Sequence, residues 1–132
     1  CLNVRGVTVL DDSYNANPDS MDAALHALRG LPGGGRRIAV LGRMGELGSY
    51  AEEGYRRVGR TAAENADFLI VVGEETSPLA DEAEAAGACG VHRTGNTHEA
   101  AAALRELAMS GDAVLIKGSR SARMERVLED FA

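Results

Sequence analysis

The residues of this chain that are best suited to chemistry form a polar loop near its start, at residues 11–17. The loop holds two carboxylates, two carboxamides, a phenol and a hydroxyl: Asp11, Asp12, Ser13, Tyr14, Asn15 and Asn17. Such groups bind ribose hydroxyls, metal-bound water or phosphate oxygens. The loop has no nucleophile beside a general base, so its composition indicates ligand binding and not covalent catalysis. The alternative interpretation is an Asx-rich turn that only caps the helix after it.

A second polar loop, at residues 117–123, gathers positive charge. Three basic side chains stand beside one glycine and two serines: Lys117, Gly118, Ser119, Arg120, Ser121 and Arg123. Arginine binds a carboxylate or phosphate through two parallel hydrogen bonds, and lysine binds it as a point charge. The loop therefore suits an anionic ligand. The alternative is that the serines cap a helix while the arginines lie on the surface.

The third candidate loop, at residues 42–48, is rich in glycine. Its glycines, at positions 42, 45 and 48, do not follow the G-x-G-x-x-G pattern of dinucleotide-binding loops. The chain also contains no G-x-x-x-x-G-K-[ST] sequence. An enzyme that uses a nucleoside triphosphate would therefore have to bring its phosphate loop from another domain.

Each of the three loops follows a predicted β-strand. Short apolar and β-branched runs predict strands at residues 1–4, 7–10, 37–41, 68–72, 91–93 and 113–116. Apolar residues at helical spacing predict helices at 18–29, 50–64, 77–86, 97–109 and around 124–131. Asn17 is a suitable N-cap for the first helix, with Pro18 in its first turn.

This alternation of strands and helices predicts one domain over residues 1–132. The expected fold is a three-layer α/β/α Rossmann-like sandwich, with a mostly parallel sheet of about six strands and an antiparallel first strand. Parallel strands place their carboxyl ends on one edge of a sheet, where open α/β sheets bind ligands. The three loops should therefore line a single cleft.

The composition of the chain limits its partners. The formal net charge is −6 and the basic residues are scattered, so we expect neither nucleic acid nor an anionic membrane as a partner. Cys1 and Cys89 belong to no C-x-x-C or Cys/His cluster, which argues against a disulfide framework or a zinc site. No apolar run approaches about 18 residues and no leader precedes the first strand, so we expect a cytoplasmic protein. Because the chain begins inside a predicted strand, we expect a fragment of a longer protein.

Other kinds of site fit the sequence less well. The first loop resembles a calcium loop in spacing, but Ala16 stands where the obligatory glycine should be. In a phosphorylation-switched receiver module, Asp11, Asp12 and Lys117 would be the acidic pair and the lysine. That module also needs a phosphoacceptor aspartate after the central strand, and residues 72–74 offer none. A generic nucleotide-binding Rossmann-like domain stays open as an alternative.

Three motifs taken together resemble the C-terminal domain of the Mur ligase family. They are DDSYNANPDSM at residues 11–21, LGRMGELG at 41–48 and LIKGSRSARME at 115–125. The resemblance covers essentially the whole chain. It is greatest to the members of the family that add D-alanyl-D-alanine to UDP-N-acetylmuramoyl-tripeptide. Arg43 departs from the family pattern, which has an acidic residue at this position.

The resemblance implies a three-domain cytoplasmic enzyme of peptidoglycan synthesis. Such an enzyme activates a carboxylate with ATP and Mg²⁺ as an acyl phosphate, which the amine of the dipeptide attacks. This chain would be the domain that closes over ATP, inactive without the N-terminal and central domains, of which the central one carries the phosphate loop and the main metal ligands. The resemblance assigns the nucleotide side to Asp12, which is also the predicted catalytic residue, and to Tyr14, Asn15 and Asn17. It assigns the dipeptide side to Glu46, Lys117, Ser119 and Arg120.

Overall fold

The computed structural model describes residues 1–12, 16–32, 35–45, 47–88 and 90–132 of the chain. Within these ranges a six-stranded sheet forms the centre of the domain, in the strand order β1-β2-β6-β3-β4-β5. Its strands are β1 (Leu2–Val4), β2 (Val7–Asp12), β3 (Arg37–Leu41), β4 (Phe68–Val72), β5 (Val91–Thr94) and β6 (Ala113–Lys117). The pair β1–β2 is antiparallel and the other neighbouring pairs are parallel, as the sequence predicts.

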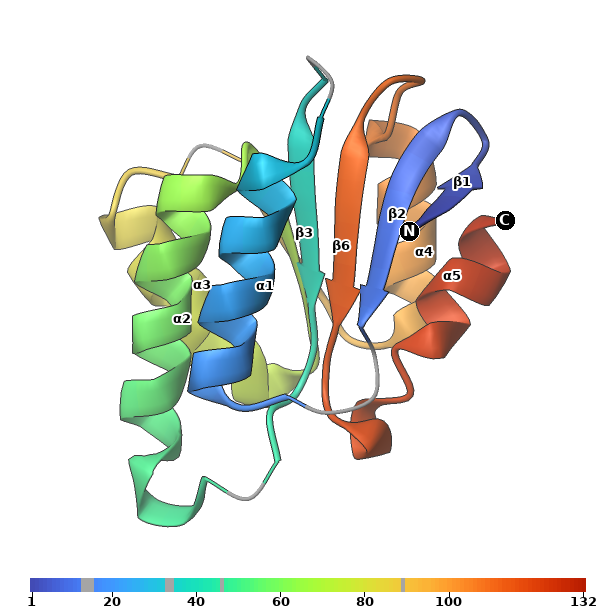
Figure 1. Ribbon diagram of the computed structural model, residues 1–132. Coiled ribbons are helices and arrows are strands. Elements are labelled where there is room, and N and C mark those ends of the chain that lie inside the picture. Colours follow the sequence, from blue (N-terminus) through green and yellow to red (C-terminus); the bar gives the residue numbers. More distant parts are fainter. Residues whose placement is uncertain (13–15, 33–34, 46, 89) are drawn as a thin grey trace.

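Helices cover both faces of the sheet (Figure 1). They are α1 (Pro18–Gly30), α2 (Ala51–Asn65), α3 (Ser77–Ala85), α4 (Thr97–Leu107) and α5 (Glu125–Phe131). Side chains alternate between the faces along each strand, so Ala39 and Leu41 of β3 pack with α1, α2 and α3. Ile38 and Val40 of the same strand pack with α4 and α5 on the opposite face. The predicted three-layer α/β/α sandwich is confirmed.

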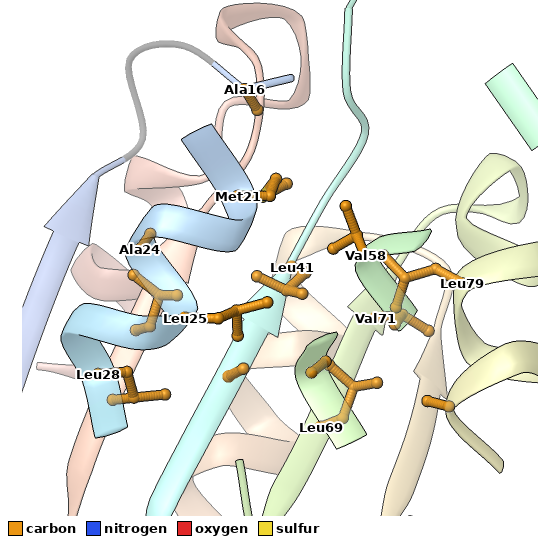
Figure 2. Packing of buried hydrophobic residues seen from close by; sticks show 14 of the residues in the cluster. Ala16, Met21, Ala24, Leu25, Leu28, Leu41, Val58, Leu69, Val71 and Leu79 are labelled. Carbon is orange, nitrogen blue, oxygen red and sulfur yellow. The ribbon is translucent and has the colours of Figure 1, made fainter. Parts of the chain in front are cut away.

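The core is aliphatic because the chain has few aromatic residues. Helix α1 shows how it is built: its predicted apolar stripe is buried and lies over the sheet (Figure 2), through Met21, Ala24, Leu25 and Leu28. These residues recur every three or four positions, which places them on one side of the helix. Burial of a leucine or methionine side chain contributes about 1.5–3 kcal/mol to folding. The stripe therefore fixes the helix that follows the first polar loop.

Two element boundaries differ from the predicted ones by two residues, and the other boundaries agree to within one residue. Strand β2 continues past residue 10 to Asp12, because Asp11 and Asp12 pair in register with Ile116 and Lys117 of β6. Helix α4 ends at Leu107 and not at residue 109. There the Arg36 guanidinium donates a 2.6 Å hydrogen bond to the carbonyl of Leu107, which takes the place of a further helical turn.

An ion pair closes the amino edge of the sheet. Nη2 of Arg36 lies 2.8 Å from Oδ2 of Asp112, which is almost fully buried. The Asp112 carboxylate also accepts the backbone amides of Arg36, at 3.1 Å, and of Met109, at 2.9 Å. Burial alone raises the pKa of Asp112, but the hydrogen bonds from Arg36 and from the two amides outweigh it, so the pKa lies below its ordinary value. The ionised carboxylate thus joins the segments before β3 and β6.

We expect Asp112→Asn to destabilise the domain by about 2–3 kcal/mol at neutral pH, because the buried donors lose a charged acceptor. A depressed carboxyl pKa gives stability that is present above the unfolded pKa, about 4, and is lost as the pH falls through the folded pKa. The difference between wild type and variant should therefore shrink in acid. Urea unfolding of both chains at pH 7 and pH 3 measures it. An equal difference at the two pH values would contradict this account.

Candidate functional site

The three predicted loops meet at the carboxyl edge of the sheet, where β2, β3 and β6 end side by side (Figure 1). Backbone hydrogen bonds join them. The amide of Gly45 in the second loop of the chain donates to the carbonyl of Ala16 in the first, at 3.3 Å. The amide of Ser119 in the last loop donates to the carbonyl of Arg43, at 2.7 Å. Segments more than a hundred residues apart in sequence therefore form one surface, as predicted.

Two glycines allow the loops after β3 and β6 to approach each other. The amide of Gly42 donates to the carbonyl of Lys117 at 2.9 Å, with Met124 fully buried against both loops. A Cβ atom at Gly118 would lie 2.5 Å from Cγ of Met124, and one at Gly42 would lie 2.5 Å from its sulfur. Both distances are well inside the usual carbon contact of about 3.5–4 Å. The glycines of this edge thus serve close packing.

Asp12 and Lys117 form an ion pair at the centre of this edge. They are direct neighbours in the β2–β6 pairing, and Nζ of Lys117 lies 2.8 Å from Oδ2 of Asp12. The two side chains differ in exposure: 2% of the Lys117 side chain is exposed and 48% of the Asp12 side chain. The ammonium ion therefore lies inside the protein, whereas the carboxylate stands at the surface of the site.

The glycine-rich loop is also tied to helix α2. The amide of Met44 donates to the Tyr55 hydroxyl at 3.0 Å, and both side chains are buried. Burial raises the pKa of Tyr55 above its ordinary value, although the hydrogen bond from Met44 opposes the change. The phenol therefore stays neutral at physiological pH and can accept this bond. This hydrogen bond anchors the glycine-rich loop to helix α2.

Asn17 caps helix α1, which confirms one of its two predicted roles. Its side-chain oxygen accepts the amide of Ser20 at 2.9 Å, and the Ser20 hydroxyl accepts the amide of Asn17 at 3.0 Å. The reciprocal bonds satisfy amides that have no partner within the helix. Asn17 is exposed, and the N-terminus of α1 carries partial positive charge beside the first loop. Its predicted contact with a nucleotide stays a prediction.

The other predicted binding residues fall into two groups. Ser119 is buried in the last loop and its hydroxyl lies 3.0 Å from that of Ser121, while Arg120 is exposed and begins a 3₁₀ turn over Arg120–Ala122. Among the described residues, neither serine makes the helix-capping hydrogen bond of the alternative interpretation. Ser13, Tyr14, Asn15 and Glu46 lie outside the described residues. The departing residue of the family pattern, Arg43, donates to the Ser121 hydroxyl at 3.3 Å and so links two of the loops.

The sequence did not indicate that the site surface continues beyond the three loops. A hollow of about 270 Å³ adjoins the last loop, and it is lined by Val72, Gly73, Glu75, Gly95, Asn96, Thr97, Ser121, Ala122, Arg123 and Arg126. Arg123 adopts a left-handed backbone conformation, with φ 51°. Five of these ten residues follow β4 or β5, whose carboxyl ends share the same edge. The rule that open α/β sheets bind ligands at the carboxyl ends of their strands could have predicted that these residues belong to the site.

In the part of the chain that the structure describes, no three His, Cys, Asp or Glu side chains are grouped so that they could hold a metal ion. No helix among the described residues combines the length and apolar composition that crossing a bilayer requires.

The fold and the three joined loops correspond to a domain of ligases. A family model described as "Mur ligase, glutamate ligase domain" matches residues 1–120, so the chain belongs to the Mur ligase family. This membership leaves the receiver module without support.

Three relatives show which enzyme of this family the chain is similar to. UDP-N-acetylmuramoyl-tripeptide–D-alanyl-D-alanine ligase of Mycobacterium leprae is 42% identical over 88% of this chain and 26% of that protein. The structure of the MurF ligase from Thermotoga maritima in complex with ADP has a TM-score of 0.80 and 31% identity, over 96% of this chain and 28% of the other. A MurF from Acinetobacter baumannii gives 0.86 and 29%, over 98% and 29%. These matches confirm the resemblance that the motifs indicate. The chain spans about a quarter of the length of these relatives.

Proposed function

We propose that this chain is the C-terminal domain of a cytoplasmic ligase that adds D-alanyl-D-alanine to UDP-N-acetylmuramoyl-tripeptide in peptidoglycan synthesis. The observation that carries the proposal is the convergence of the three family motifs on one sheet edge, beside the half-exposed carboxylate of Asp12. The similarity to enzymes named for this reaction supplies the substrates. The whole enzyme would consist of an N-terminal and a central domain followed by this one.

The nucleotide side of the edge is proposed for the first loop. An exposed carboxylate oxygen of Asp12 can accept hydrogen bonds from ribose hydroxyls or from water bound to a metal ion. The positive end of helix α1, capped by Asn17, favours a nearby phosphate. Tyr14 and Asn15 would complete this side. The relative from Thermotoga maritima, which was solved with ADP, supports ATP as the nucleotide.

The dipeptide side is proposed for the loops that carry Glu46, Ser119 and Arg120. D-alanyl-D-alanine has an amine at one end and a carboxylate at the other, so it needs partners of both charges. Arg120 is exposed on this edge and can bind a carboxylate through two hydrogen bonds, while Glu46 can accept from an amine. The fourth residue predicted for this side, Lys117, is paired with Asp12, and its role is considered below.

The chemistry itself would take place mainly on the missing domains. ATP supplies a phosphoryl group that makes the substrate carboxylate an acyl phosphate and therefore a good electrophile. By the family resemblance, Mg²⁺ would be held mainly by the central domain. This domain would then orient the nucleotide through Asp12, present the dipeptide amine to the acyl phosphate and exclude water when it closes. These are effects of position, and they need no nucleophile in this chain.

An assay of the full-length protein tests the proposed function. Phosphate release from ATP should require both UDP-N-acetylmuramoyl-tripeptide and D-alanyl-D-alanine, and mass spectrometry should show the pentapeptide product. D-alanyl-D-alanine methyl ester, which lacks the carboxylate, serves as the matched control and should react poorly. Phosphate release that does not depend on the dipeptide, with no ligated product, would exclude this function.

A further inference from the structure

Lys117 is unusual in the composition of the chain. Thirteen of the 14 basic residues are arginines and Lys117 is the only lysine. It is also among the most buried residues of the protein, with 1% of its surface exposed, at the end of the central strand β6. An ammonium ion loses much hydration free energy when it is buried, so such a position requires a strong compensating interaction. A charge meant only for solubility would lie at the surface.

The sheet holds Lys117 rigidly on both sides. It is in register with Asp12 of β2 and with Leu41 of β3, so its backbone is fixed between two neighbouring strands. Its carbonyl accepts the amide of Gly42, which begins the glycine-rich loop. Its Nζ therefore has a well-defined position below the surface of the site. From there it reaches Oδ2 of Asp12 at 2.8 Å.

The two side chains of the Lys117–Asp12 ion pair differ in their exposure to solvent. The buried ammonium ion contacts Asp12, while 48% of the Asp12 side chain is exposed. One oxygen of the carboxylate is thus anchored from within. A side chain whose rotamer is already fixed loses less conformational entropy when it binds a ligand. It therefore binds the ligand more tightly.

We propose that Lys117 is a positioning residue, which holds the carboxylate of Asp12 in place for the nucleotide and does not itself bind the dipeptide. The inference rests on the proposed function, because it assigns Asp12 to the nucleotide side of that site. It also replaces the role for Lys117 that the family resemblance implied. A side chain that is 2% exposed presents almost no surface to a dipeptide carboxylate, whereas its bond to Asp12 is formed.

The test is a double-mutant cycle in the full-length protein, with Lys117→Met, Asp12→Asn and the two combined. Methionine keeps most of the length of the lysine stem and removes the charge. We expect Lys117→Met to raise the KM for ATP and the Kd of ADP by about 10-fold, while the KM for D-alanyl-D-alanine changes less than about 2-fold. Because Lys117 acts through Asp12, the double variant should bind ADP no more weakly than Asp12→Asn, within about 2-fold.

Arg36→Met is the matched control, since it breaks an ion pair with the buried Asp112 carboxylate at the opposite edge of the sheet. It should lower the Tm and leave both KM values unchanged. The inference would be overturned by a KM increase for the dipeptide with ADP affinity unchanged, or by losses of ADP affinity that multiply in the double variant. A lower Tm with unchanged ADP affinity would also overturn it, because the pair would then be only structural.

If Lys117→Met does not fold, as judged by circular dichroism, Lys117→Gln removes the same charge with a more polar side chain, and the same expectations apply. The calorimetric Kd of ADP does not depend on ligation. A wild-type protein that binds ADP but forms no pentapeptide would therefore contradict the proposed function, while the effect of Lys117 on ADP would still be measured.

Discussion

The purified 132-residue chain is expected to fold and to release no phosphate from ATP, even with both proposed co-substrates present. Each face of its sheet is covered by helices around a buried core, which is what independent folding requires. Its ligand edge, however, would be one half of a cleft. Half a cleft makes too few contacts to offset the translational and rotational entropy that a ligand loses on binding.

The measurement compares phosphate release by the isolated chain and by the full-length protein at equal concentration. Circular dichroism of the isolated chain is the control, because an unfolded chain would also be inactive. Turnover by a folded 1–132 chain would contradict the proposal that this is one domain of a larger ligase. A full-length protein that is active only with this domain attached would support it.

Asp12→Asn in the full-length protein should reduce kcat/KM for ATP by about 10- to 100-fold. Asparagine keeps the shape of the side chain but removes its charge, and a hydrogen bond to a charged group is worth about 1.5–3 kcal/mol. The replacement also leaves the buried ammonium of Lys117 without its carboxylate partner. Both effects act at the same site, so the loss should concern the nucleotide.

The neighbouring Asp11 provides a matched control for this variant. It is also exposed and also ends β2, but the alternation of the strand places it on the opposite face from Asp12. Asp11→Asn should therefore change kcat/KM for ATP by less than about 3-fold. Equal losses in the two variants would indicate a general effect of charge at this edge. Unchanged kinetics in Asp12→Asn would mean that the first loop is structural.

Most of the fold could be predicted from the sequence, because the strand segments are clearly more apolar than the segments around them. Strand β4 begins and ends where its continuous apolar run does, and β3 adds only Arg37 before its run. The predicted β2 ends at residue 10 because carboxylates are uncommon in strands, whereas the observed strand continues to Asp12. Asp11 and Asp12 extend it only because β6, a hundred residues later in sequence, offers them a ladder. Contacts of that kind depend on strand order, which no local pattern contains.

The same limit applies to the site. The positions of the three loops followed from the rule that parallel strands end on one edge, and the structure brings them together. The pairing of Asp12 with Lys117 did not follow, because it requires β2 and β6 to be neighbours in the sheet. A buried lysine and a surface lysine also look identical in a sequence. The observation that Lys117 is the only lysine was available, but it acquires meaning only with its burial.

The most direct test of the central claim is a crystal structure of the full-length protein with an ATP analogue and D-alanyl-D-alanine. The quantity to measure is the distance from the Asp12 carboxylate to the nearest ribose hydroxyl of the nucleotide. We expect a hydrogen-bond distance, about 2.6–3.2 Å, directly or through one water, with Lys117 still bonded to Oδ2 of Asp12. A nucleotide bound away from the carboxyl edge of the sheet, or a Lys117 ammonium moved from Asp12 to the dipeptide carboxylate, would contradict the account.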